Sequence, residues 1–171
     1  MTKDVLELDK DQIAEFIPNV EDKFFTDSAY AVIDKNWLVS EGYKGYRKWL
    51  GFAGLSKWKS NWDCDNLAVS FKLYMQMLHA KYNPYTFTDR WKKKGENATN
   101  VDSVAVGVIY FKIDADDRRA HAINLLICAD GYEIGQKGNR HKLKKVYFEP
   151  KGGVAIELMK KEEETIWYAN F

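Results

Sequence analysis

The feature that most constrains the fold is a change of pattern near residue 83. Residues 64–82 repeat apolar side chains at intervals of three and four without Gly or Pro, which predicts a helix after an N-cap at Asp63. The second half is rich in Val, Ile, Tyr and Phe, and its runs predict strands over 103–113, 120–129, 143–149, 154–158 and 165–171. We therefore expect an α+β fold with N-terminal helices, in which the long helix packs on an antiparallel sheet.

The shorter signals complete this prediction. Asp130 and Gly131 form a dipeptide that favours a hairpin turn, and residues 12–17 suit a short helix that stops at Pro18. Residues 24–60 are expected to form an irregular loop rich in aromatic side chains, with a short helix near Tyr46. No repeat or low-complexity tract divides the 171 residues, so we expect a single domain over 1–171.

Composition limits the classes of function. The net charge is +1, which argues against a chain that is basic or acidic throughout. The first residues, MTKDVLELDKDQ, have no hydrophobic signal core and no stretch approaches the roughly 18 apolar residues of a membrane span. We therefore expect a cytoplasmic protein with no membrane partner, whose two cysteines, Cys64 and Cys128, remain reduced. The histidines lie far apart in sequence, so we expect no metal and no cofactor.

Cys64 is the first candidate for chemistry because it begins the predicted long helix. A thiol at a helix N-terminus is close to the positive end of the helix dipole, which favours the reactive thiolate. The neighbouring carboxylates of Asp63 and Asp65 oppose this effect. The alternative is a small buried residue that starts an amphipathic helix, and Cys128 is expected to be such a packing residue in a strand.

His121 and Glu149 are candidates for the groups that would assist a thiol. His121 begins one predicted strand and Glu149 ends the next, so the two side chains can meet across antiparallel neighbours. In that arrangement Cys64 would attack a carbonyl, His121 would transfer the proton, and Glu149 would orient the imidazole. Asn124 is an alternative third member, although strand alternation directs its side chain to the face opposite that of His121.

Three segments carry a family resemblance. Trp62–Ala68 (WDCDNLA), Ala120–Asn124 (AHAIN) and Phe148–Pro150 (FEP) resemble the Cys, His and acid boxes of transglutaminase-like and papain-like cysteine peptidases. They resemble more closely a group of small bacteriophage and bacterial proteins with D-C-D, H-A-x-N and E-P-Q boxes, although Lys151 stands where that pattern has Gln. The resemblance implies a papain-like or transglutaminase-like fold and a Cys64, His121 and Glu149 triad in a host cytoplasm. The oxyanion donor stays open among Asn61, Trp62 and the backbone N–H of Cys64.

A second function competes with catalysis, namely binding without chemistry. Basic residues lie beside aromatic residues in two stretches, a pattern that suits polyanions. One stretch consists of Arg90, Trp91, Lys92, Lys93 and Lys94, and the other contains Lys44, Arg47, Lys48, Lys57 and Lys59 beside Tyr43, Tyr46, Trp49 and Trp58. A further basic region contains Lys137, Arg140, Lys142, Lys144, Lys145 and Lys151, with His141 inside it. Because the net charge is near zero and no nucleic-acid module signature appears, nucleic acid is not the favoured partner.

Two functions therefore follow from the sequence. The first is a cysteine amide hydrolase or acyl transferase acting on a protein or peptide without a cofactor. The second is a non-catalytic protein of the same fold that binds a host macromolecule, such as a phage virion component or an inhibitor of a host system.

Overall fold

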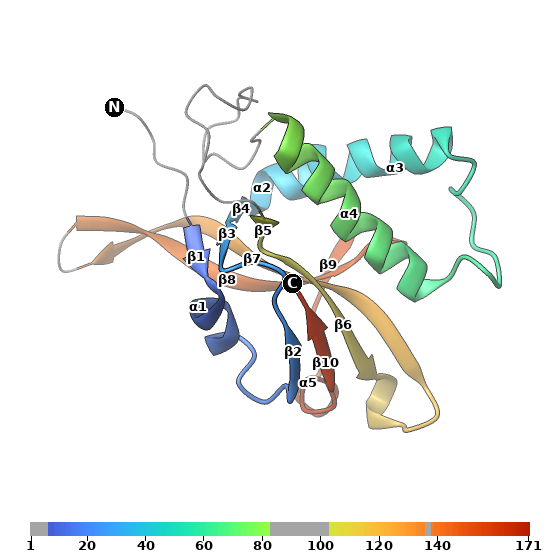
Figure 1. Ribbon diagram of the computed structural model, residues 1–171. Coiled ribbons are helices and arrows are strands. Elements are labelled where there is room, and N and C mark those ends of the chain that lie inside the picture. Colours follow the sequence, from blue (N-terminus) through green and yellow to red (C-terminus); the bar gives the residue numbers. More distant parts are fainter. Residues whose placement is uncertain (1–6, 83–102, 136–137) are drawn as a thin grey trace.

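The computed structural model describes residues 7–82, 103–135 and 138–171, which form two sheets and the helices that cover them (Figure 1). A smaller sheet has the order β1-β3-β5, formed by Glu7–Asp9, Ala29–Ala31 and Ser103–Val104. The larger sheet has the order β2-β10-β6-β7-β8-β9, and β4 also pairs with β7. Its strands are β2 Asp22–Phe24, β4 Ile33–Asp34, β6 Val106–Lys112, β7 Ala120–Gly135, β8 Gly138–Glu149, β9 Val154–Ile156 and β10 Tyr168–Asn170.

The helices connect and cover these sheets. They are α1 Lys10–Glu15, α2 Lys35–Trp37, α3 Tyr43–Phe52, α4 Cys64–Tyr82 and α5 Lys160–Glu163, with a π-helical turn at Leu38–Gly42 and a 3-10 turn at Ile113–Ala115. α3 and α4 lie over one face of the larger sheet, while α1 lies toward the other (Figure 1). In the described part of the chain, no helix is both long and apolar enough to cross a membrane.

The alternation of side chains along β7 explains the two apolar cores. Ile123, Leu125 and Ile127 belong to the core that includes Ile13 and Ile17 beside α1. Leu126 and Cys128 face the other way, into the core that contains Phe71 of α4. Because β7 is covered on both faces, almost all of residues 122–129 are apolar and buried.

The expected fold class is wrong. The N-terminal region was expected to supply helices, but residues 7–34 contain four short strands and one six-residue helix. The described residues form ten strands in two sheets, with α3 and α4 on one face of the larger sheet, and this is not the expected papain-like or transglutaminase-like α+β arrangement. Strands of two or three residues are too short to show an alternating pattern, so their pairing is decided by distant partners.

Some of the individual helices, turns and loops predicted from the sequence are confirmed and others are wrong. The helix over 64–82 is confirmed. The turn at Asp130 and Gly131 is wrong, because β7 continues through them with a shift of register between Ala129 and Tyr132. Gly131 has a φ of 77°, a conformation that glycine adopts easily. It lies at the irregularity within the β7–β8 hairpin, not at the turn that joins the two strands. The short helix expected near Tyr46 is confirmed as α3, whereas the irregular loop expected over the rest of 24–60 is wrong where β3, β4 and α2 lie.

Candidate functional site

His121 and Glu149 meet on one face of the larger sheet. Nε2 of His121 lies 2.7 Å from Oε2 of Glu149, and the two side chains are 23% and 20% exposed. The last β7–β8 pair joins Asn124 to Phe148, so Glu149 stands near Ile123 and reaches His121 diagonally on the same face. The other oxygen, Oε1, accepts a hydrogen bond from the backbone N–H of Lys151 at 3.1 Å. Both carboxylate oxygens are therefore fixed, and Nδ1 is the ring atom not engaged by Glu149.

Cys64 lies where the sequence predicted, at the first residue of α4. Asp63 marks the helix start, since its carbonyl accepts from Leu67 N–H at 3.0 Å and its N–H donates to Oδ1 of Asn66 at 3.2 Å. The thiol is half-buried and packs against Ala68, Val108 and Ala122. Cys64 therefore touches β7 at the residue that follows His121.

The thiol and the imidazole lie on opposite faces of β7. Alternation directs His121 to the face of Phe111, whose ring centroid is 5.7 Å from that of the imidazole. Ala122, which Cys64 contacts, points to the α4 face. Within the described residues no hydrogen bond joins Cys64 to His121. The β7–β8 pairs end at Asn124, so residues 120–123 of β7 pair with β6 alone.

Two carboxylates flank the thiol. A hydrogen bond between the side chains of Asp63 and Asp65 raises the pKa of Asp63 and lowers that of Asp65. Burial raises the pKa of Tyr110, and the nearby charge of Asp65 raises it further. Tyr110 and Cys64 pack against the same cluster of Ala68, Val108 and Ala122. The ligand atoms of Asp63, Cys64 and Asp65 lie within 4.8 Å of one another, so these three residues could together hold a cation.

The candidate oxyanion donors have different environments. The backbone N–H of Trp62 already donates to the carbonyl of Lys59 at 3.0 Å, whereas Nε1 of its indole is buried and has no hydrogen-bond partner among the described residues. Asn61 is exposed. The backbone N–H of Cys64 belongs to the first turn of α4, where helical N–H groups have no partner within the helix.

Asn124 serves a different purpose from the one considered for it. Its side chain is fully buried, and Nδ2 donates to the carbonyls of Ala68 at 2.9 Å and Gly107 at 3.2 Å. It therefore ties α4 to β6 on the face opposite His121, rather than orienting the imidazole. Cys128 is fully buried in β7, and burial raises its thiol pKa far above the usual range.

The predicted polyanion contacts Arg90, Trp91, Lys92, Lys93 and Lys94 lie outside the described residues. The structure adds a group that sequence reasoning did not bring together. Nζ of Lys151 lies 4.4 Å from the centroid of Trp58, and both line a small pocket beside Glu149 with Arg47 and Leu67. The sequence showed Lys151 in the basic region over 137–151 and Trp58 in the basic and aromatic stretch over 43–59, but it gave no indication that the two meet.

Comparisons with known proteins concern the fold alone. No family model matches the chain, and no curated protein matches it. Two solved structures are similar over 97% of this chain. One is described as "PSL1a-E64 complex" (TM-score 0.62, 16% identity), and the other as Polyporus squamosus lectin bound to the human-type influenza-binding epitope Neu5Aca2-6Galb1-4GlcNAc (TM-score 0.59, 15% identity). The chain spans about half of these structures, 51% and 50% respectively.

These neighbours correct the classification drawn from the short sequence boxes. The structures that match include a lectin, so describing the chain as cysteine-peptidase-like, transglutaminase-like or a hydrolase of papain-like fold is wrong. The boxes are short, and three local matches do not determine the arrangement of ten strands. The comparisons give no support to a bacteriophage origin or to a cytoplasmic location. At 15–16% identity the likeness shows the fold and assigns no activity.

Proposed function

We propose that Cys64, His121 and Glu149 form a thiol-nucleophile site that transfers an acyl group from an amide or ester. The observation that supports this most strongly is the 2.7 Å contact between Nε2 of His121 and Glu149 beside a thiol at a helix start. A carboxylate in this position fixes the imidazole tautomer and stabilises its protonated form. Nδ1 then becomes the atom that exchanges protons with the thiol and with the leaving group.

The proposed reaction has two steps. His121 takes the thiol proton as the sulfur of Cys64 attacks the carbonyl carbon, and it returns that proton to the departing amine or alcohol. The acyl group is then held on Cys64 as a thioester. Water or an amine, deprotonated by His121, attacks the thioester carbon and releases the thiol. In this proposal the backbone N–H of Cys64, in the first turn of α4, donates to the carbonyl oxygen.

This reaction requires the thiol and the imidazole to close the gap between them. Catalytic hydrogen bonds are often long in unliganded sites and tighten when substrate binds. Cys64 packs against the cluster that includes Ala122, the neighbour of His121, so the proposal requires the imidazole to reach the α4 face of β7.

Selective alkylation tests the proposal. Iodoacetamide near neutral pH should label Cys64 well ahead of Cys128, which is fully buried and serves as an internal control. His121→Ala should slow the labelling of Cys64 while the circular dichroism of the protein stays unchanged. E64, a thiol-reactive epoxide, is a second probe because one structural neighbour is a complex with it. Equally slow labelling of both thiols would overturn the proposal.

Carbohydrate binding is the second candidate function. One structural neighbour is a lectin bound to Neu5Aca2-6Galb1-4GlcNAc. In this chain Trp58 is 49% exposed, and an exposed indole ring can stack on a sugar ring. Titration of this trisaccharide against the protein, followed by calorimetry, should give saturable binding that Trp58→Ala removes. Binding that is absent, or unchanged in that variant, would remove this candidate.

Nucleic-acid binding through Arg90, Trp91, Lys92, Lys93 and Lys94 stays a prediction from the sequence. Its test is the affinity for single-stranded DNA at rising salt, with Lys92, Lys93 and Lys94 replaced by Gln. Affinity that is absent at low salt would rule it out, because counterion release makes such binding strongest there.

A further inference from the structure

A small pocket lies beside the proposed site. Its volume is about 170 Å³, and its apolar walls come from Leu50 of α3, Leu67 of α4 and Pro150 after β8, all of them buried, together with the half-buried Leu55. Pockets for whole drug-sized ligands usually measure about 300–1,000 Å³. This pocket is therefore suited to one group of a larger substrate.

All the charged side chains that line the pocket are positive. Arg47, Lys57 and Lys151 line it, and no acidic residue does. Lys151 lies over the ring of Trp58, and Arg47 donates to the hydroxyl of Tyr43 at 3.2 Å. Across residues 7–82, 103–135 and 138–171, none of these three cations forms an ion pair with an acid. Their charge is thus available to a ligand.

The pocket is attached to the proposed site at two points. Leu67 follows Cys64 by three residues on α4, a rise of about 4.5 Å along the helix. Pro150 and Lys151 follow Glu149 directly, and the N–H of Lys151 donates to the Glu149 carboxylate at 3.1 Å. Since an extended peptide advances about 3.4 Å per residue, a donor held at Cys64 would place a neighbouring side chain in the pocket.

We propose that this pocket binds a carboxylate side chain of the acyl donor, within one or two residues of the attacked carbonyl. The acid would be Glu or Asp, with its methylene groups against Leu67 and Pro150 and its oxygens toward Arg47, Lys57 and Lys151. This inference rests on the proposed acyl-transfer function and names its substrate class as an acidic peptide.

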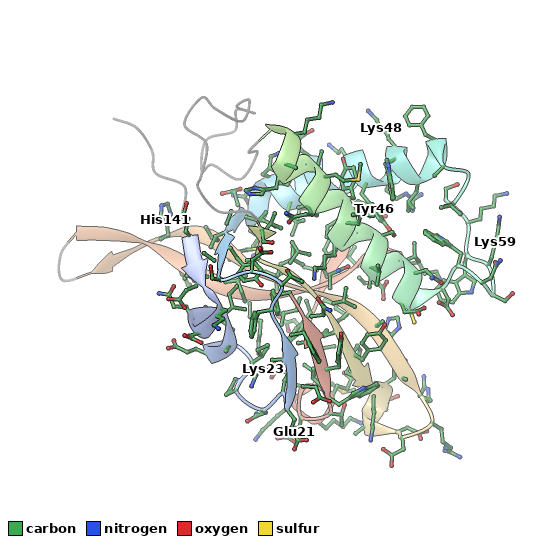
Figure 2. All side chains as sticks on the ribbon, in the orientation of Figure 1. Glu21, Lys23, Tyr46, Lys48, Lys59 and His141 are labelled. Atoms are coloured by element: carbon green, nitrogen blue, oxygen red, sulfur yellow. The ribbon has the colours of Figure 1, made fainter. Side chains whose placement is uncertain are left out.

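The test compares matched peptides that differ in one charge. Acetyl-Ala-Glu-Gly and acetyl-Ala-Gln-Gly chloromethyl ketones alkylate a thiol with loss of chloride, and their rates with Cys64 can be followed by mass spectrometry. We expect the Glu reagent to react about fivefold faster, with a preference that declines as salt screens the cations. Lys57→Gln combined with Lys151→Gln should abolish the preference, whereas Lys48→Gln should retain it. Lys48 is an exposed lysine on α3 that does not line the pocket (Figure 2).

A binding measurement separates failure of this inference from failure of the proposed chemistry. The unreactive amides acetyl-Ala-Glu-Gly-NH₂ and acetyl-Ala-Gln-Gly-NH₂ can be titrated against Cys64→Ala by NMR, which needs no thiol. A Glu preference here with no labelling of Cys64 would reject the acyl transfer and retain the anion-binding pocket. Equal binding of the two amides would overturn the inference, as would a sialylated trisaccharide that occupies the pocket while neither peptide binds.

Discussion

The imidazole of His121 and the carboxylate of Glu149 meet at 2.7 Å across the β7–β8 hairpin. The contact is diagonal, because Glu149 lies one step beyond the last pair of the ladder, Asn124 with Phe148. The backbone N–H of Lys151 holds the second carboxylate oxygen. An orientation fixed at both oxygens is what a proton-transferring imidazole requires from its partner.

Replacing Glu149 by Gln tests the charge at this contact. Gln keeps the shape and a hydrogen bond but no longer stabilises a protonated imidazole, so alkylation of Cys64 should slow by about tenfold or more. The rate constant for iodoacetamide labelling, measured by mass spectrometry, checks this. Glu157→Gln is the matched control, since Glu157 is exposed and lies after β9. An unchanged rate in Glu149→Gln would mean that the pair has a structural role only.

The meeting of His121 and Glu149 was open to sequence reasoning because each lies near an end of a neighbouring antiparallel strand. The relation of Cys64 to His121 was not, because it depends on which face of β7 packs under α4. A shift of one residue in register would have placed the imidazole on the α4 face. Lys151 and Trp58 meet only through the way β8 ends over α3 and α4, which no local pattern indicates.

The fold was predictable only where a segment is long enough to show a period. The helix over 64–82 repeats its apolar residues through nineteen positions, and it formed as predicted. β1, β3 and β5 have two or three residues each and are held by one another. These short strands form only because they pair with one another, and such pairing cannot be read from the local sequence. Because they were missed, helices were expected in the N-terminal region and the predicted α+β class was wrong.

Asn124 should be important for stability rather than for chemistry. Its Nδ2 donates to the carbonyls of Ala68 and Gly107 in a fully buried position, and removal of such a group costs about 1–3 kcal/mol. Asn124→Ala should therefore lower the free energy of unfolding in urea by about that amount. Asn61→Ala, an exposed control, should change it by less than about 0.5 kcal/mol. Equal stability of the two variants would show that the buried amide contributes nothing.

Gly153 is required by both its backbone and its neighbour. Its φ is 65°, and a Cβ there would lie 1.8 Å from Cζ of Tyr43. Gly153→Ala should destabilise the protein by more than about 1 kcal/mol in urea unfolding, whereas Gly51→Ala, with open space around it in α3, should be neutral or stabilising.

A double variant separates the two causes at Gly153. Adding Tyr43→Ala removes the clash but leaves the positive φ, so it should recover part of the loss when compared with Tyr43→Ala alone. Full additivity of the two substitutions would show that the ring and the new Cβ do not meet.

Lys72 should make stability depend on pH above neutrality. Burial lowers the pKa of Lys72 to about 8, although its Nζ donates to Oδ1 of Asn170 at 2.6 Å and the charge of Asp27 acts in the opposite direction. An unfolded lysine has a pKa of about 10.4, so the unfolded chain binds more protons between the two values. The unfavourable effect of the buried charge is thus fully present below pH 8 and is relieved as the pH rises toward 10.

The measurement is the free energy of unfolding of the natural chain minus that of Lys72→Met, followed from pH 6 to 10. The difference should be flat between pH 6 and 7 and should then rise in favour of the natural chain, because only its folded state sheds a proton early. Lys48→Met provides the control, since Lys48 is exposed and its difference should stay flat throughout. Tyrosines that titrate near pH 10 are present in all three proteins, so their contribution cancels in the differences. A flat curve for Lys72→Met would show that the ammonium group of Lys72 is as well solvated in the fold as in the unfolded chain.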